Sequence, residues 1–371
     1  MGCLNCIRVP LVFFFRCVVY YLPCLFKHRV EIKVSLSDQL RQNYSRRGGF
    51  HTNYYRTEIS TRDTFYALLG LFMKRRGTEE ALKIFQRLSR DMTADGQVPS
   101  AYVFTWSGDK PVYKKESVPI VDANMYYIIL AWKCYDSFPK EIEHGYLHCQ
   151  RAYRWLETFV FKDTLHEPVG ASWQNTIKHD GPVLLSNVLH IQTIRSMECL
   201  ACVLKDSRQQ ELFIAKHKQA LSKWVPEIYK TQETLPRILS IHWNMVRTDF
   251  IQSFDQELQC PLVPLRTAGP VKDETTWSAW VYGRQDLHTT IVWPWVGYLY
   301  MCVLCSQRRT SLAQKWWAKY TKFNHHQTLF DIYDKDTHFP IRRAFLKSMP
   351  SDSKTLSLRL AAQHFLHGTV V

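Results

Sequence analysis

The stretch EISTRDTFYALLGLF places a charged pair, Arg62 and Asp63, at the start of an apolar helical run. One explanation is capping. An acidic side chain in the first turn interacts favourably with the helix dipole, by roughly 0.3–1 kcal/mol, and Thr61 would then be the N-cap. The other explanation is ligand binding. A guanidinium presents hydrogen-bond donors and a carboxylate presents acceptors, so together they can hold two neighbouring hydroxyl groups. The pair alone leaves both explanations open.

The composition limits the classes of partner. Of the 371 residues, 46% are hydrophobic and 14% aromatic, which is enough apolar material for a large core in one or two domains. The twelve tryptophans are of a type often placed where a flat apolar ligand must be held. The formal net charge of +15 would suit an acidic partner, but the basic residues are scattered, so we do not expect nucleic acid. No glycine-rich phosphate loop is present, so we expect no nucleotide and no other cofactor.

The eleven cysteines include three CxxC spacings that lie far apart in the sequence. They are Cys3 with Cys6, Cys199 with Cys202, and Cys302 with Cys305. The short spacer of a zinc ribbon is missing, and His144 and His148 form an HxxxH pair without a third ligand, so we expect no metal site. Most cysteines fall in apolar helical runs and are interpreted as buried, reduced thiols. This interpretation favours the cytoplasm.

The N-terminal region argues against that location. We divide the chain into a hydrophobic segment, residues 1–45, and a single helical domain, residues 46–371. Residues 7–26 are long enough to span a bilayer, but Arg16 lies in the middle and two prolines interrupt the run. A membrane anchor, a secretory signal and a helix buried on the domain all stay open. Membrane association through residues 7–26, or secretion, is therefore the alternative to a cytoplasmic location.

From Thr61 onward the apolar residues recur at helical spacing, and no run alternates with a sustained period of two. Tight turns join the two helices of a pair, and longer, aromatic-rich loops join one pair to the next. Paired antiparallel helices either stack into a solenoid or close into a ring. Because the pairs share no repeat consensus, the sequence predicts an all-α ring. The helices are expected near residues 61–77, 78–92, 122–138, 140–160, 184–204, 208–229, 235–258, 293–305, 311–320 and 356–366.

Several stretches resemble (α/α)6-toroid glycoside hydrolases. TRDTFYALLGLF, EEALKIFQRLSRDMTADGQVP and VPIVDANMYYIILAW look like the opening helices of amylo-α-1,6-glucosidases of the glycogen-debranching type, neutral/alkaline invertases and processing α-glucosidase-like enzymes. GASWQNTIKHDGPVLLSNVLHIQTIRSM, HTTIVWPWVGYLYMCVL and LFDIYDKD are similar to three later motifs, in family order. For a divergent member, the resemblance implies an (α/α)6 toroid, complete or with an incomplete ring. It also implies hydrolysis of α-linked glucosides or sucrose-like saccharides.

The resemblance also implies a binding site for a saccharide. In this family an Arg-Asp pair lies at the blind end of the sugar pocket, and tryptophan rings stack on the apolar face of the sugar. The expected substrate-binding residues are Arg62, Asp63, Trp173, Lys178, His288, Trp293 and Trp295. Inverting hydrolysis further needs two carboxyl groups about 6.5–9.5 Å apart, one to protonate the leaving oxygen and one to activate water.

The carboxyl groups are where the sequence departs from the family. Asn175 stands at the place of the general acid, and an amide cannot donate a proton at the strength of an acid. Asp122 matches an aspartate of the invertases and is either the alternative acid or an N-cap. Asp331 stands near the place of the base, which is Glu in the family. Other acids that could replace the missing one have no motif support: Asp163, Glu167 and Asp180.

Three functions therefore stay open: a glycoside hydrolase, a catalytically degenerate toroid that only binds saccharides, and a helical scaffold for a protein partner. Acid catalysis matters most when the leaving group is poor. We therefore expect weak turnover of natural disaccharides and measurable hydrolysis of an α-glucosyl fluoride. Asn175→Asp should raise activity on the natural substrate, and Asp331→Ala should remove it.

Overall fold

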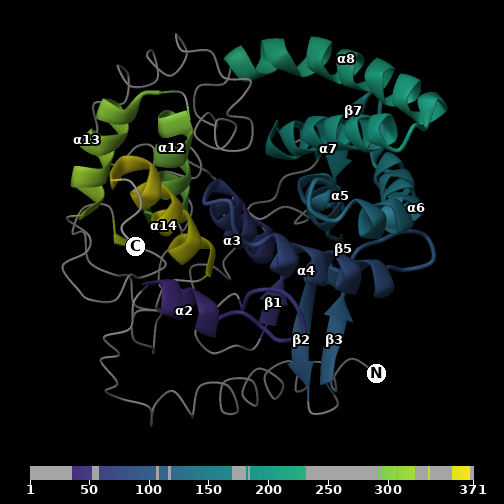
Figure 1. The fold of residues 1–371 in the computed structure, drawn as a ribbon. Helices are drawn as coiled ribbons and strands as arrows, with labels where there is room; N and C mark the ends of the chain where they lie inside the picture. Colours follow the sequence, from purple (N-terminus) through teal and green to yellow (C-terminus); the bar gives the residue numbers. More distant parts are fainter. Residues whose placement is uncertain are drawn as a thin grey trace, which may run out of the picture.

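The structure, a computed structural model, describes residues 36–51, 58–105, 108–115, 118–168, 181–182, 184–230, 291–292, 294–306, 308–321, 333–334 and 353–367. Helices make up most of these residues, and the strands are short connections between them (Figure 1). None of the helices in these ranges is long and apolar enough to cross a membrane. Residues 7–26 lie outside the described ranges.

Five helices pack side by side as an inner arc. They are α7 (Leu184–Val203), α5 (Asp122–Cys134), α3 (Thr61–Met73), α14 (Ser353–His367) and α12 (Pro294–Ser306), and each packs against the next in that order. Nearly every residue of α5 is buried, because this helix has neighbours on several sides. A helix with apolar residues on all sides is typical of a protein interior.

Outer helices cover the arc and give it a second layer. They are α4 (Thr78–Arg90), α6 (Pro139–Glu157), α8 (Ser207–Lys230) and α13 (Thr310–Thr321). Both α4 and α6 pack on α5, α8 packs on α7, and α13 packs on α12. The short helix α2 (Leu36–Gln42) packs on α14 and adds Leu40 to the core. The inner and outer helices therefore form two layers, and the mostly helical architecture agrees with the all-α fold that the sequence predicted.

The contact between α3 and α14 joins helices from distant parts of the sequence (Figure 1). Gly70 permits this approach, since a Cβ atom there would lie 2.5 Å from Oγ and 2.7 Å from the carbonyl carbon of Ser357. Ser357 Oγ donates a hydrogen bond of 2.6 Å to the carbonyl oxygen of Ala67. Ser353 Oγ donates one of 3.0 Å to the carbonyl oxygen of His51. The first bond holds α14 against the middle of α3, and the second holds the first residue of α14 against the segment that follows α2.

The strands form small antiparallel sheets in the loops. β1 (Glu58–Ser60), β2 (Ala101–Thr105) and β3 (Gly108–Val112) make one sheet, and β4 (Lys114–Lys115) pairs with β5 (Val118–Pro119). β6 (Val160–Phe161), β7 (Thr164–Glu167) and β8 (Gly181–Pro182) make another. β9 (Ile291–Val292) pairs with β10 (Tyr333–Asp334), with Tyr333 opposite Val292 and Asp334 opposite Ile291.

The predicted helices agree with the observed ones to within a few residues at most ends, with one helix outside the described ranges, residues 235–258. The capping prediction at α3 is wrong in one respect. Ser60, not Thr61, is the N-cap, and its side chain accepts a hydrogen bond from the backbone N–H of Asp63. The Thr61 hydroxyl instead donates to the carbonyl oxygen of Pro99, at 2.7 Å.

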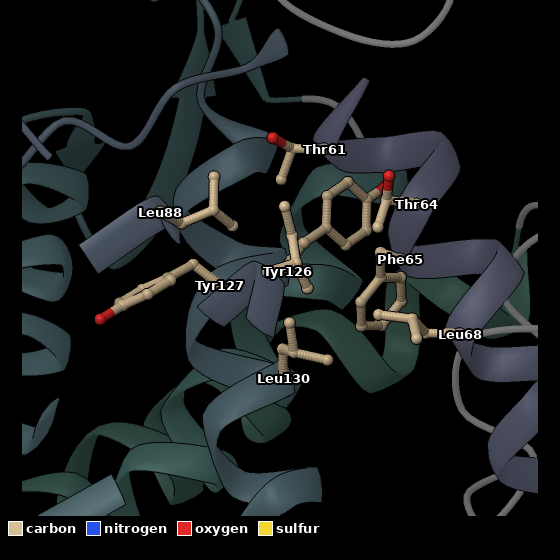
Figure 2. Close-up of a pocket in the computed structure, with 9 residues that line it drawn as sticks. Thr61, Thr64, Phe65, Leu68, Leu88, Tyr126, Tyr127 and Leu130 are labelled. Atoms are coloured by element: carbon tan, nitrogen blue, oxygen red, sulfur yellow. The ribbon is translucent and has the colours of Figure 1, made fainter. Parts of the chain in front are cut away.

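A small cavity lies in the core between α3, α4 and α5 (Figure 2). Its volume of about 10 Å³ is no more than a single water molecule needs. The rings of Phe65 and Tyr126 stack beside it with centroids 4.6 Å apart. Its lining is mainly apolar, with two threonines: Thr61, Thr64, Phe65, Leu68, Ile84, Leu88, Tyr126, Tyr127 and Leu130. We interpret it as a packing gap, not as a ligand site.

Candidate active site

The first turn of α3 carries an ion pair that reaches α5. Arg62 Nε donates to Asp122 Oδ2 over 2.6 Å, and the side chains are 20% and 6% exposed. Burial acts to lower the pKa of Arg62, but the charge of Asp122 and the hydroxyl of Tyr126 outweigh it, so the pKa is raised. Asp122 is not an N-cap, because that position of α5 is Val121 and has no side-chain cap bond. The carboxylate of Asp122 pairs with Arg62 instead.

Asp63, the next residue of α3, forms an ion pair with a residue of α14. Lys354 Nζ donates to Asp63 Oδ1 over 3.1 Å. The ammonium group lies 5.8 Å from the ring centroid of Trp295, whose ring is in turn 5.0 Å from that of Tyr66. Only 6% of Trp295 is exposed, so this tryptophan forms the wall behind Lys354. Asp63 and Lys354 keep 19% and 11% of their side chains exposed.

A third carboxyl group belongs to the same electrostatic environment. Glu167 ends β7, is 2% exposed and accepts a hydrogen bond from Ser186 of α7 through Oε1. Its other oxygen, Oε2, is buried and has no hydrogen-bond partner among the described residues. Burial raises the pKa of Glu167 to about 7. The Ser186 bond and the Arg62 charge oppose that shift, and the Asp122 charge adds to it. Glu167 is therefore a carboxyl group that holds its proton up to near neutral pH.

The structure brings four of the predicted site residues together: Arg62, Asp63, Asp122 and Trp295. The remaining predicted site residues lie outside the described ranges: Trp173, Asn175, Lys178, His288, Trp293 and Asp331. Two ionisable residues complete the cluster: Glu167, one of the three acids named above without motif support, and Lys354, which was not predicted to lie in it. Glu167 carried a weak signal, as an acid just before the GASWQNT motif. Lys354 carried none, because 291 residues separate it from Asp63.

The cluster is defined here as Arg62, Asp63, Asp122, Glu167 and Lys354. Its two cations each face one carboxylate. Arg62, Asp63 and Lys354 are partly exposed, and donors and acceptors of this kind suit a ligand with many hydroxyl groups, since each hydroxyl both donates and accepts. Over the described residues, no group of three or more His, Cys, Asp or Glu side chains could hold a metal ion.

No protein-family model and no curated protein sequence matches the chain. Solved structures do match. A GH63 mannosylglycerate hydrolase from Thermus thermophilus, in complex with glucose, is 12% identical over 88% of this chain and 98% of its own, with a TM-score of 0.58. A glycosidase variant in complex with glucose is 11% identical over 89% and 95%, at 0.55. A D-mannose isomerase is 8% identical over 91% and 99%, at 0.53.

These likenesses establish the class of fold. The chain has the all-α toroid fold of glycosidase-like proteins, as the sequence predicted. At 8–12% identity the comparisons show the fold alone, and one of the similar proteins is an isomerase. The resemblance to amylo-α-1,6-glucosidases and neutral/alkaline invertases stays a prediction.

Proposed function

We propose that this protein is a glycoside hydrolase that acts on α-linked glucosides or sucrose-like saccharides with inversion. The observation that carries the proposal is Glu167, a buried carboxyl group that holds a proton to about pH 7 beside the Arg62–Asp122 ion pair. Glycoside hydrolysis needs one carboxyl group of this kind, with a pKa raised towards the working pH. The toroid fold that the chain shares with glycosidases supports the same conclusion.

Arg62 and Asp63 are proposed to bind the sugar. Both side chains keep about a fifth of their surface exposed while their partners hold them in place. Guanidinium and carboxylate groups held in this way can bond to adjacent hydroxyls. The glucose complexes of two similar structures support a saccharide as the ligand. Trp173, Lys178, His288, Trp293 and Trp295 stay proposed members of the sugar site.

We assign the role of the general acid to Glu167 and not to Asp122 or Asn175. Asp122 is held in an ion pair with Arg62, whereas Glu167 forms no ion pair among the described residues, and its Oε2 has no hydrogen-bond partner there. Glu167 would transfer its proton to the glycosidic oxygen, and the electron pair of the broken C1–O bond would move to that oxygen. Water would add to C1 and give its proton to a base, for which we propose Asp331.

Rates on two substrates test this assignment. Maltose has a poor leaving group and needs an acid, whereas α-glucosyl fluoride does not. Glu167→Gln should lower kcat/KM on maltose by about 10²–10⁴-fold and change fluoride hydrolysis by less than about tenfold. Asp331→Ala should remove both activities. Glu198→Gln is the matched control. Glu198 bonds to Arg195 and His217 along α7 and α8 and has no place in the cluster.

Other outcomes would reassign the roles. Loss of maltose hydrolysis in Asp122→Asn but not in Glu167→Gln would make Asp122 the acid. Suppose instead that Asn175→Asp raises the activity and Glu167→Gln leaves it unchanged. The position of the general acid would then be residue 175, as the family resemblance alone predicts. If neither substrate reacts with any variant, the hydrolase proposal fails and the saccharide-binding or scaffold function takes its place.

A further inference from the structure

The position of Lys354 is unfavourable for stability on two counts. It is the second residue of α14, at the positive end of the helix dipole, where a cation is disfavoured. The whole residue is also only 9% exposed, and lysine is almost never buried this deeply unless it is paired. Asp63 provides the pairing at 3.1 Å. Ion pairs so placed contribute little to stability compared with a well-packed apolar pair, so stability alone does not explain this lysine.

Lys354 and Asp63 lie next to the other ion pair of the cluster. Arg62 and Asp63 are consecutive, so the pair to α5 and the pair to α14 start from one turn of α3. The two cations are matched by two carboxylates, and Glu167 is uncharged below about pH 7. Over its described residues the cluster therefore has no net charge with which to bind an anionic substituent.

The spacing between Lys354 and Asp63 is fixed before any ligand binds. Ser357 bonds to the backbone of α3 at Ala67, and Ser353 bonds to the backbone at His51, one on each side of Lys354 in sequence. The ring of Trp295 lies under the ammonium group. Donors and acceptors fixed in this way lose little entropy on binding and discriminate by geometry.

We infer that Lys354, together with Asp63, is a sugar-binding and specificity-determining pair that selects an uncharged hexose unit over sugar acids and sugar phosphates. Lys354 would donate to one hydroxyl while Asp63 accepts from its neighbour. An anionic substituent would have to break one of the two ion pairs to find a cation. This inference rests on the proposed saccharide ligand and extends it to a residue of α14 and to a class of sugar.

Calorimetric titration of the full-length protein tests the inference, with glucose, glucuronate and glucose 6-phosphate as probes. Salt near 0.15 M limits non-specific attraction of anions to a chain of net charge +15. Lys354→Met should raise the Kd for glucose by about 10- to 100-fold, the usual effect of losing a hydrogen bond to a charged group. Lys216→Met is the matched control. Lys216 pairs with Glu157 between the outer helices α8 and α6, so its removal should leave the Kd within about twofold.

The charged probes should bind wild-type protein at least about tenfold more weakly than glucose. An unchanged glucose Kd in Lys354→Met overturns the role of Lys354, and tighter binding of glucuronate or glucose 6-phosphate overturns the sugar class. In both cases saccharide binding itself survives. No binding of any probe by the wild type would overturn the proposed saccharide ligand as well.

Lys354→Met leaves Asp63 without its partner, so circular dichroism must establish that the variant folds. If it does not, the double variant Asp63→Asn with Lys354→Gln takes its place, because it removes both charges and leaves none unpaired. It should weaken glucose binding by a similar factor. Wild-type affinity in the folded double variant would overturn the inference.

Discussion

Arg62 Nε lies 2.6 Å from Asp122 Oδ2, and this bond joins the first turns of two neighbouring inner helices. The following residue, Asp63, makes the corresponding bond to Lys354 of α14. One helical turn therefore connects three inner helices through its charged side chains. Neither Asp63 nor Asp122 caps its helix through its carboxylate, since Ser60 caps α3 and the α5 cap is Val121.

We predict that Arg62→Ala destabilises the protein by about 3 kcal/mol, because it leaves the 4%-exposed Asp122 without its partner. The double variant Arg62→Gln with Asp122→Asn should recover most of that loss. Urea denaturation of the two variants gives the comparison. Equal stability of Arg62→Ala and wild type would show that the pair contributes nothing to the fold.

We predict that stability depends on pH through Glu167. Its pKa is about 7 in the folded protein against an ordinary 4.5, so the folded state holds more protons between these values. The free energy of unfolding should therefore fall as pH rises from about 4.5 to 7 and level off above, a total on the order of 3 kcal/mol. Glu167→Gln should remove this slope. Thermal melts of wild type and variant at several pH values measure it, and identical slopes would contradict the assignment.

We predict that Gly70→Ala loosens the contact between α3 and α14. The added Cβ would lie 2.7 Å from the carbonyl carbon of Ser357, and backbone atoms cannot move aside cheaply. Overpacking of this kind costs about 1–3 kcal/mol, which differential scanning calorimetry detects as a lower Tm. Lys83→Ala, at an exposed position of α4, is the control and should melt with the wild type. An unchanged Tm in Gly70→Ala would mean that the helices are further apart than described.

We predict unequal reactivity among the free cysteines. Burial raises the pKa of Cys134 and of Cys149 to about 12, so little thiolate forms at pH 8, while Cys202 is exposed on α7. Limited alkylation followed by peptide mass spectrometry should label Cys202 at least about 100-fold faster than the other two. The difference should vanish in urea. Equal labelling in the native state would contradict the buried positions.

The sequence was a good guide to what depends on local pattern. The spacing of Phe65, Leu68 and Leu69 predicted α3, and the motifs around Arg62 and Asp122 predicted three members of the cluster, Arg62, Asp63 and Asp122. The cap of α3 was assigned one residue too late, because Ser60 and Thr61 are adjacent and both belong to the residue types that cap helices. Only the geometry of β1 and of the Pro99 backbone decides between them.

What the sequence could not predict depends on distant contacts. Lys354 belongs to no motif, and it joins the cluster only because α14 packs on α3. The proton affinity of Glu167 is likewise set by groups from other elements, Asp122, Arg62 and Ser186, together with burial. A glutamate at a strand end has the same sequence signature whether it is solvated or desolvated.

The packing of α14 on α3 also constrains how the protein folds. The bonds from Ser357 to Ala67 and from Lys354 to Asp63 span 290 and 291 residues. Contacts of such high sequence separation form late. The closure of a long loop costs entropy before the contact contributes any favourable free energy. During synthesis the first inner helix has no partner on that side until nearly the whole chain has emerged. Until then its apolar flank is open to chaperones and to aggregation, so assembly of the ligand site is expected to be a slow, post-translational step.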